Sequence, residues 1–258
     1  MTYIKNNILK TTLKSFFFIL SFIFIFLIIF KPHFFLQTKV VNFIFKDLGF
    51  ELKKVEVLGN HYVRKSEIIN NIKFINCESL FCLDLMSTKK LIEGNNWIKS
   101  VKLKLILPAQ LKITIKEEEP YFIYKNEKKL VLLNIKGNKI DNLDYISDEF
   151  KNLVLLKGEG AINNIPNLLS ILSLNNNISG KVTAASLIAK RRWSLKYLTN
   201  IIIDLPESNP EKAFYKIAEL EQKYGLLSNK LKKIDLRVSD RMIIQLDTEE
   251  YDLEENNI

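Results

Sequence analysis

The sequence is poor in the residues that build metal centres and phosphate-binding loops. Its 258 residues include only two histidines, two cysteines and eight glycines. His33 and His61 are single and far apart, and the two cysteines have no second pair, so the sequence does not support a metal site. Gly158 and Gly160 are followed by Ala161, not by a lysine at P-loop spacing. These absences argue against a metal enzyme and a P-loop nucleotide-binding protein.

The remaining polar residues form no catalytic group at a recognisable spacing. His61 has no serine, cysteine or acid partner in a matching position, so we interpret it as a surface histidine. The acidic run Glu117-Glu118-Glu119 offers neighbouring carboxylates, but a polar strand end explains it more simply than a glycosidase pair. No cofactor is expected either. The sequence predicts a protein that binds and does not catalyse.

The net charge of +9 does not indicate a nucleic-acid partner. The lysines are scattered along the chain, and no basic stretch is interleaved with aromatic residues. Lysine, asparagine and isoleucine are abundant throughout, which indicates a general residue bias. Attraction to an anionic membrane surface is the more natural consequence of this charge.

Cys77 and Cys82 lie close together in the sequence. In an oxidising compartment a local disulfide between them is expected, and over so short a loop it would contribute less than about 3 kcal/mol. The alternative, which the sequence leaves open, is a pair of half-buried free thiols.

One long hydrophobic run dominates the amino-terminal part. Residues 16–30 are Phe, Ile and Leu apart from Ser21, with Lys14 before the run and Lys31 after it. The run is shorter than the ~20 residues of a usual spanning helix. Apolar neighbours extend it and the two lysines can snorkel, so we predict a transmembrane helix over 15–36.

Two other interpretations of this run are weaker. A soluble core helix would need a polar face, which is missing. A cleavable signal peptide would need small residues after the run, where the sequence has Lys31-Pro32-His33. Lysines flank the run on both sides, so charge hardly sets the orientation. Because a long globular segment follows, we predict a cytoplasmic tail over 1–14 and the bulk of the chain outside.

Residues beyond the run predict an α+β fold in two parts. After a helical linker (37–51), the segment 52–119 has the order strand, helix, helix, strand, strand, with a first helix capped by Ser66 and a hairpin at Pro108. The segment 120–247 predicts a mixed, strand-rich domain with flanking helices, one of them over 210–224. It ends in two strands, predicted over 234–238 and 242–246. Residues 248–258 form an acidic tail.

Short motifs in both parts resemble those of a known family. In the first part they are Val55-Glu56-Val57-Leu58-Gly59-Asn60, Trp97-Ile98-Lys99-Ser100-Val101 and Leu111-Lys112-Ile113-Thr114-Ile115, which resemble a POTRA domain. In the second part they are Lys190-Arg191-Arg192-Trp193, Leu205-Pro206-Glu207 and Ile234-Asp235-Leu236-Arg237. In order and spacing the whole set is similar to the bacterial FtsQ/DivIB division proteins, which have one membrane span, a POTRA domain and a β domain.

The resemblance implies a function and a binding site. It implies a non-enzymatic, single-pass scaffold of the inner membrane, with its domains in the periplasm and concentrated at the division septum. Such a scaffold links early and late division proteins and binds the coiled-coil proteins FtsB and FtsL through the final, exposed strand of the β domain. By motif, the partner-binding residues would be Arg191, Arg237, Val238, Asp240, Ile244, Gln245 and Leu246.

Two further hypotheses come from other classes. A POTRA domain also occurs in accessories of outer-membrane protein transport and assembly. The chain after residue 120 is, however, too short for the large membrane barrel that such proteins usually carry. An enzyme of the cell envelope is the third hypothesis. The position of a fluorescent fusion in dividing cells separates division from transport.

Overall fold

The computed structural model describes residues 18–19, 21–22, 49–75, 79–127, 129–198, 200–228, 230–238 and 240–247. Most of the predicted membrane helix (15–36), most of the linker (37–51) and the acidic tail (248–258) lie outside these residues. Within them, no helix has the length and apolar character needed to cross a membrane. The chain divides into two compact units between Glu117 and Glu118.

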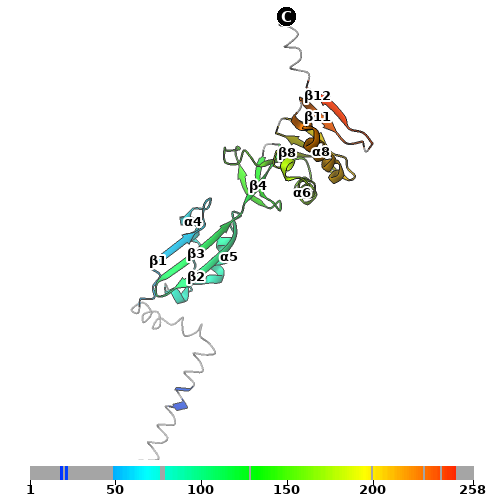
Figure 1. The fold of residues 1–258 in the computed structure, drawn as a ribbon. Helices are drawn as coiled ribbons and strands as arrows, with labels where there is room; N and C mark the ends of the chain where they lie inside the picture. The colour runs from blue at the N-terminus through cyan, green and yellow to red at the C-terminus, as the bar shows by residue number, and fades with distance from the viewer. Residues whose placement is uncertain are drawn as a thin grey trace, which may run out of the picture. The chain divides into compact units, whose positions relative to one another are not determined.

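The first unit is a three-stranded sheet with helices. Its elements are β1 (Lys54–Leu58), α4 (Lys65–Asn70), η1 (Leu80–Cys82), α5 (Leu85–Glu93), β2 (Ile98–Ile106) and β3 (Gln110–Glu117) (Figure 1). The strands are in the order β1-β3-β2, with β1 parallel to β3 and the β2–β3 hairpin antiparallel. Ile68 of α4, Ile92 of α5, and Leu111 and Ile113 of β3 meet in its buried core. The predicted order of strands and helices is confirmed.

The two helices begin differently from the sequence prediction. Ser66 does not cap α4: the helix starts at Lys65, and its N-cap residue Arg64 makes no side-chain cap hydrogen bond. In α5 the side chain of Asp84 accepts a hydrogen bond from the backbone N–H of Ser87, at 2.9 Å. An acidic cap satisfies free N–H groups of the first turn, so α5 starts at Leu85, whereas the sequence pattern predicts a second helix over 87–93.

Glu117 joins the loop after β1 to the end of β3. Its carboxylate accepts hydrogen bonds from the backbone N–H groups of His61, Tyr62 and Val63, at 3.0, 3.0 and 2.9 Å. The Tyr62 ring stacks on Trp97 with centroids 4.1 Å apart. Bonds to an ionised acceptor are the stronger kind. The first carboxylate of the acidic run therefore has a structural role.

Replacing Glu117 with alanine is expected to destabilise the first unit. Three backbone N–H groups lose their acceptor, which costs about 1–3 kcal/mol of unfolding free energy. Urea unfolding of the purified chain, followed by tryptophan fluorescence, measures the change. Glu119→Ala, at an exposed position of the same acidic run, is the matched control and should change stability by less than about 0.5 kcal/mol. Equal effects in the two variants would contradict the structural role of Glu117.

The second unit is built on one mixed sheet, whose strands in the described part of the chain follow the order β12-β11-β10-β9-β8-β7-β4-β5-β6. The strands are β4 (Pro120–Asn126), β5 (Lys129–Asn134), β6 (Lys139–Leu143), β7 (Val154–Lys157), β8 (Val182–Ile188), β9 (Arg192–Tyr197), β10 (Ile202–Asp204), β11 (Leu231–Asp235) and β12 (Ile243–Leu246). The two edges of this sheet are therefore β12 and β6.

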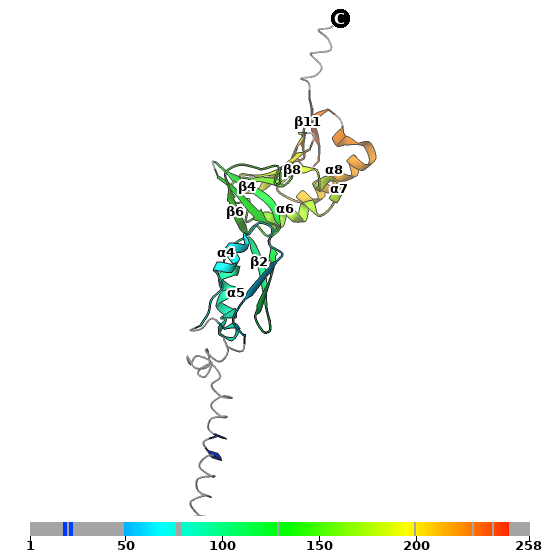
Figure 2. The same ribbon diagram turned by 90° about the vertical axis from the view of Figure 1, so that its left-hand side faces the viewer.

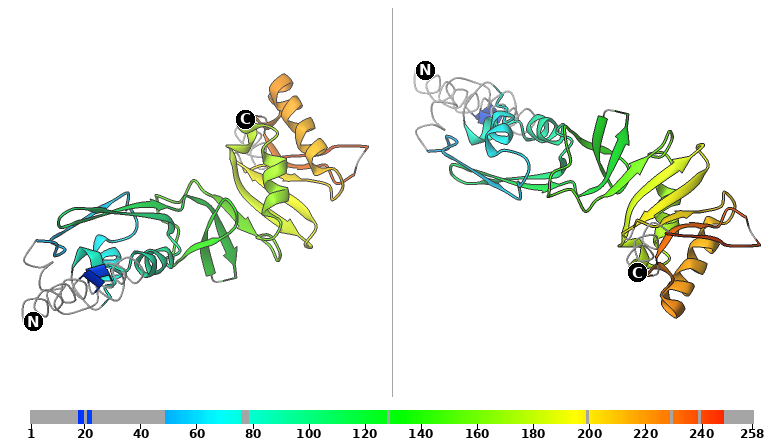
Figure 3. Two further views of the ribbon diagram at one scale, coloured as in Figure 1. Left: turned by 90° about the horizontal axis from the view of Figure 1, so that it is seen from below. Right: turned by 90° about the horizontal axis from the view of Figure 1, so that it is seen from above.

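Helices pack on one face of this sheet. They are α6 (Ile165–Leu172), α7 (Asn176–Ser179), α8 (Pro210–Tyr224) and the short η2 (Leu226–Ser228). Helices α6 and α8 contact each other and cover the sheet from the same side (Figure 3). Phe214 and Ile217 of α8 are fully buried against the sheet, and Gly225 ends the helix in a left-handed conformation. The α+β fold class and the helix over 210–224 are confirmed.

One strand prediction is wrong, and it concerns two candidate site residues. The strand predicted over 234–238 is β11, which ends at Asp235, so Arg237 and Val238 lie in the loop that follows it. The pairing register of β11 shifts between Leu231 and Lys233. This irregularity breaks the period-two alternation of apolar and polar residues, so the sequence pattern does not indicate that the strand begins at Leu231.

Candidate functional site

Strand β12 forms one edge of the second sheet. It pairs antiparallel with β11, with Ile243 opposite Asp235, Ile244 opposite Ile234 and Gln245 opposite Lys233. Among the residues that the structure describes, no strand pairs with its outer side. An edge strand presents unpaired N–H and C=O groups that another chain can extend.

The hydrogen bonds identify which backbone groups point outward. The N–H of Asp247, just after β12, donates to the carbonyl of Lys230, at 3.1 Å. In an antiparallel pair the direction of the backbone groups alternates from residue to residue. Gln245 and Ile243 therefore direct their N–H groups toward β11. Ile244 and Leu246 direct theirs toward the open side.

An apolar row crosses the sheet and ends at β12. Leu195 of β9, Ile203 of β10 and Ile234 of β11 are direct neighbours in register, and all three are fully buried. Ile244 is the next residue of this row, yet 39% of it is exposed, and Leu246 is 57% exposed. The buried face of the sheet thus continues to an edge where apolar side chains are in contact with water.

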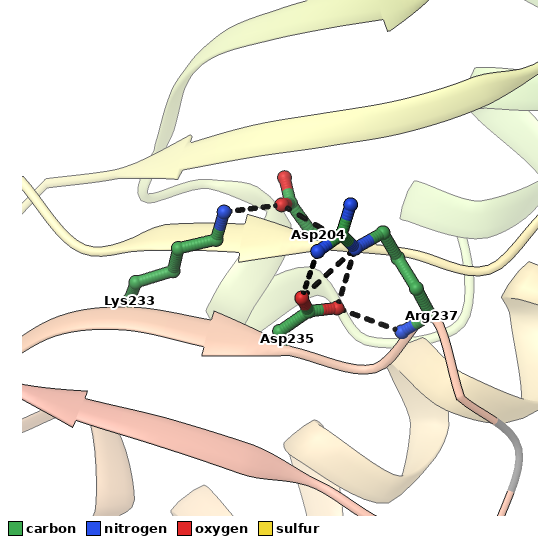
Figure 4. Close-up of polar contacts among 4 residues, drawn as sticks. All are labelled: Asp204, Lys233, Asp235 and Arg237. Atoms are coloured by element: carbon green, nitrogen blue, oxygen red, sulfur yellow. Dashed lines mark hydrogen bonds and ion pairs between the residues drawn. The ribbon is translucent and has the colours of Figure 1, made fainter.

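The opposite face carries a cluster of charges beside the edge (Figure 4). Asp204 and Asp235 are paired residues on neighbouring strands, and like charges in such positions repel. The positive charge of Lys233 offsets the negative charge of Asp204, since the Lys233 Nζ lies 2.7 Å from Asp204 Oδ2. Arg237 binds Asp235 through Nε at 2.8 Å and Nη2 at 2.5 Å, and its Nε is 4.0 Å from Asp204.

The Arg237 side chain changes the ionisation of its partner. Its hydrogen bonds to Asp235 lower the pKa of that carboxyl, against a smaller opposing effect of burial. The same hydrogen bond raises the pKa of Arg237. Because the carboxyl pKa is depressed on folding, the stabilisation by this pair is present above the ordinary pKa. It is lost as the pH falls through the lowered value.

Arg191 lies at the same end of the sheet as Arg237. It closes the turn between β8 and β9, where Ala189 and Lys190 both adopt left-handed backbone conformations. Strand β9 starts at this turn. Strand β10 runs antiparallel to β9 and therefore ends at the same end of the sheet, and β11, which is parallel to β10, ends there too. The Arg191 guanidinium forms an ion pair with Glu207, with Nε 3.4 Å from Oε2.

The other candidate residues fall into two groups. Ile244, Gln245 and Leu246 lie on β12 itself. Val238 and Asp240 lie in the exposed loop that joins β11 to β12, and Asp240 is paired with the neighbouring Arg241 at 3.1 Å. The lowered pKa of Asp240 has this hydrogen bond as its main cause.

The sequence prediction missed the residues that hold Arg237. The sequence does not identify three of them as site residues, namely Asp204, Lys233 and Asp235. Asp235 belongs to the motif Ile234-Asp235-Leu236-Arg237, but only the arginine of that motif is predicted to bind a partner. The spacing of Asp235 and Arg237, two residues apart beside a strand, is a signal for side chains on one face. No such local signal links Asp204 to Asp235, because the strands that bring them together are far apart in the sequence.

Cys82 in η1 is disulfide-bonded. Its predicted partner Cys77 lies outside the described residues, so the pairing of these two cysteines stays a prediction. In the described part of the chain, no group of three or more His, Cys, Asp or Glu side chains is arranged to hold a metal ion. The exposed edge at β12 is therefore the candidate site.

Comparisons with known proteins agree on one family. Residues 50–118 match the POTRA domain of FtsQ type, and residues 122–237 match the C-terminal domain of the cell division protein FtsQ/DivIB. Strand β12 lies beyond the second match. The properties of the edge therefore rest on the geometry of this chain.

Individual relatives carry the same description. The chain is 26% identical to the cell division protein FtsQ of Rhizobium meliloti, over 78% of this chain and 64% of that protein. It is 28% identical to FtsQ of Agrobacterium fabrum, over 77% of this chain and 62% of that protein. It is 29% identical to FtsQ of Rickettsia bellii, over 77% of this chain and 73% of that protein. The chain thus spans less than two thirds of the first two relatives.

Proposed function

Because the chain belongs to the FtsQ/DivIB family of bacterial cell division proteins, we propose that it is a non-enzymatic scaffold of the divisome. In this proposal it links early and late division proteins. It binds FtsB, in complex with FtsL, through strand β12. The POTRA surface engages other membrane proteins of the division complex.

The proposal rests mainly on strand β12, whose outer side has no partner strand among the described residues. Ile244 and Leu246 direct backbone N–H groups outward, and their side chains extend a buried apolar row into water. An added strand would pair with these groups and cover these side chains, and its alternate side chains would give specificity. An apolar edge that stays uncovered is otherwise open to unwanted pairing with other chains. The edge therefore fits a docking strand better than a surface that stays free.

The charged cluster supplies a second element of recognition. Arg237 is partly exposed beside the edge, and Arg191 lies at the same end of the sheet. We propose that they attract an acidic residue of the incoming FtsB segment. Charges at the rim of an interface mainly set orientation and association rate.

The proposed location follows from the amino-terminal run. Residues 15–36 would anchor the chain once in the inner membrane, with 1–14 in the cytoplasm and both units in the periplasm. In dividing cells the protein would concentrate at the septum. A fluorescent fusion is expected to form a band at mid-cell, and a uniform rim would contradict the division role.

Site-specific photo-crosslinking tests the docking strand. A photoreactive amino acid is placed at Ile244 or Leu246 in the full chain, in cells that also produce FtsB and FtsL. Adducts with FtsB are expected from both positions. The matched control is Lys139 on β6, the opposite edge of the same sheet. Adducts from β6 and not from β12 would mean that the partner uses the other edge.

A further inference from the structure

One end of the first unit gathers three separate segments. Strand β1 starts there, and the backbone N–H groups of Lys53 and Lys54 both donate to the carbonyl of Ala109 in the β2–β3 hairpin, at 2.9 and 3.2 Å. The segment that contains η1 joins the same end, because the N–H of Leu80 donates to the carbonyl of Phe50, at 2.8 Å. The start of β1 and the hairpin can be followed at this end in Figure 2. We name it the proximal end, since the chain enters the unit here.

The proximal end exposes large apolar side chains from different segments. Met86, in the first turn of α5, is 83% exposed, and Leu107, at the hairpin, is 59% exposed. Phe74 and Phe81 are exposed as well, and Phe81 packs on Phe50 with ring centroids 5.1 Å apart. Single exposed apolar residues need no explanation, but a group gathered at one end indicates a contact surface.

Among the described residues at this end, the exposed charges are lysines, while the acidic Glu51 and Asp84 are partly buried. Lys53, Lys54 and Lys73 are exposed. The Asp84 carboxylate is already used as the cap of α5. Apolar side chains set among lysines are typical of surfaces that lie in the interface of an anionic bilayer. Lysines near such a surface are attracted to its anionic lipids over about a Debye length.

We propose that the proximal end rests on the surface of the anionic membrane in which the chain is anchored, with Met86 and Leu107 inserted at the depth of the headgroups. This inference rests on the proposed membrane anchor over 15–36. Residues 37–49 separate the anchor from Phe50, whose carbonyl is bonded at the proximal end, and, even fully extended, they reach about 45 Å. The linker therefore limits the proximal end to about 45 Å from the bilayer, a range that includes direct contact. The contact would fix the height and tilt of the first unit above the membrane.

Brominated lipids, which quench tryptophan on contact, test the proposal. The full chain is reconstituted into vesicles of phosphatidylglycerol and phosphatidylethanolamine, with or without bromine on the acyl chains. Met86→Trp and Leu107→Trp each add one tryptophan to the natural two. Leu58→Trp is the matched control, because Leu58 is an exposed residue at the opposite end of β1. We expect the emission added at 86 and 107 to be lost in brominated vesicles, and the emission added at 58 to be retained.

Each other outcome has a defined meaning. If the alkaline-washed vesicles keep the chain but all three added tryptophans are quenched equally, or none is, the proximal end does not make the contact and the anchor stands. If alkali removes the chain from the vesicles, both the anchor and this inference fail. The triple variant Lys53→Gln, Lys54→Gln, Lys73→Gln should weaken the quenching at 86. Unchanged quenching would overturn the role of the lysines.

Discussion

Replacing Ile244 with proline is expected to abolish capture of the FtsB segment while the second unit stays folded. Proline removes an N–H that points to the open side of β12, and its ring obstructs a strand pairing there. A carbonyl of the partner would be left without its donor, which costs about 1–3 kcal/mol. This alone weakens binding by about 5- to 150-fold, and the obstruction adds to it. Calorimetry with the purified chain and an FtsB peptide measures the loss.

Two matched variants make this result specific. Ile244→Val keeps the N–H and a β-branched side chain, so it should bind nearly as well as the parent. Ile243→Pro removes an N–H that points inward to β11, so it should lower the unfolding free energy more than Ile244→Pro does. If Ile244→Pro binds as tightly as Ile244→Val, the partner does not extend this edge.

Much of the architecture could be predicted because local patterns decide it. The helix over 210–224 has a proline in its first turn, an apolar face and a following glycine, and these signals agree. Strands β2 and β3 alternate regularly around a turn. The final strand was also predicted within one residue, and it is an edge strand in the sheet order.

The errors occur where tertiary contacts override the local pattern. The bulge in β11 breaks the alternation, so the predicted strand started three residues late and took in Arg237. Glu117 binds a loop more than fifty residues away in the sequence, and no local pattern announces that contact. The pairing of Asp204 with Asp235 likewise depends on β10 and β11 becoming neighbours. Predicting a charge cluster of this kind requires knowing which strands are neighbours in the sheet, and the local sequence pattern does not show this.

Reversing the charge of Arg237 is expected to produce the second large effect. From the sequence alone, Arg237→Glu should remove partner binding and leave the fold intact. The structure changes that expectation, because a third carboxylate would then lie beside Asp235 and Asp204. The variant should therefore lose stability in the second unit as well as binding. Urea unfolding separates these two losses.

The milder Arg237→Gln variant isolates the binding contribution. Because Arg237 lies partly exposed at the rim, its loss is expected to lower the association rate and to reduce the salt dependence of binding. Arg64→Gln is the control, because Arg64 is an exposed arginine of the first unit, and it should bind like the parent. Reversing the acidic residue of the FtsB segment to lysine should restore part of the binding to Arg237→Glu and none to Ile244→Pro. Parent-like binding by Arg237→Gln would exclude the guanidinium from recognition.

The titration of Asp235 reports on the same substitution without any partner. In the parent chain the hydrogen bonds from Arg237 hold the Asp235 pKa below its ordinary value of 3.8, against the effect of burial. In Arg237→Gln that cause is removed and burial remains, so the pKa should rise. The part of the acid-induced loss of stability that Asp235 causes should therefore shrink or disappear, because its folded-state pKa moves toward or above the unfolded-state value. Carboxyl NMR titration measures the shift, and an unchanged pKa would mean that the Asp235–Arg237 pair does not form in solution.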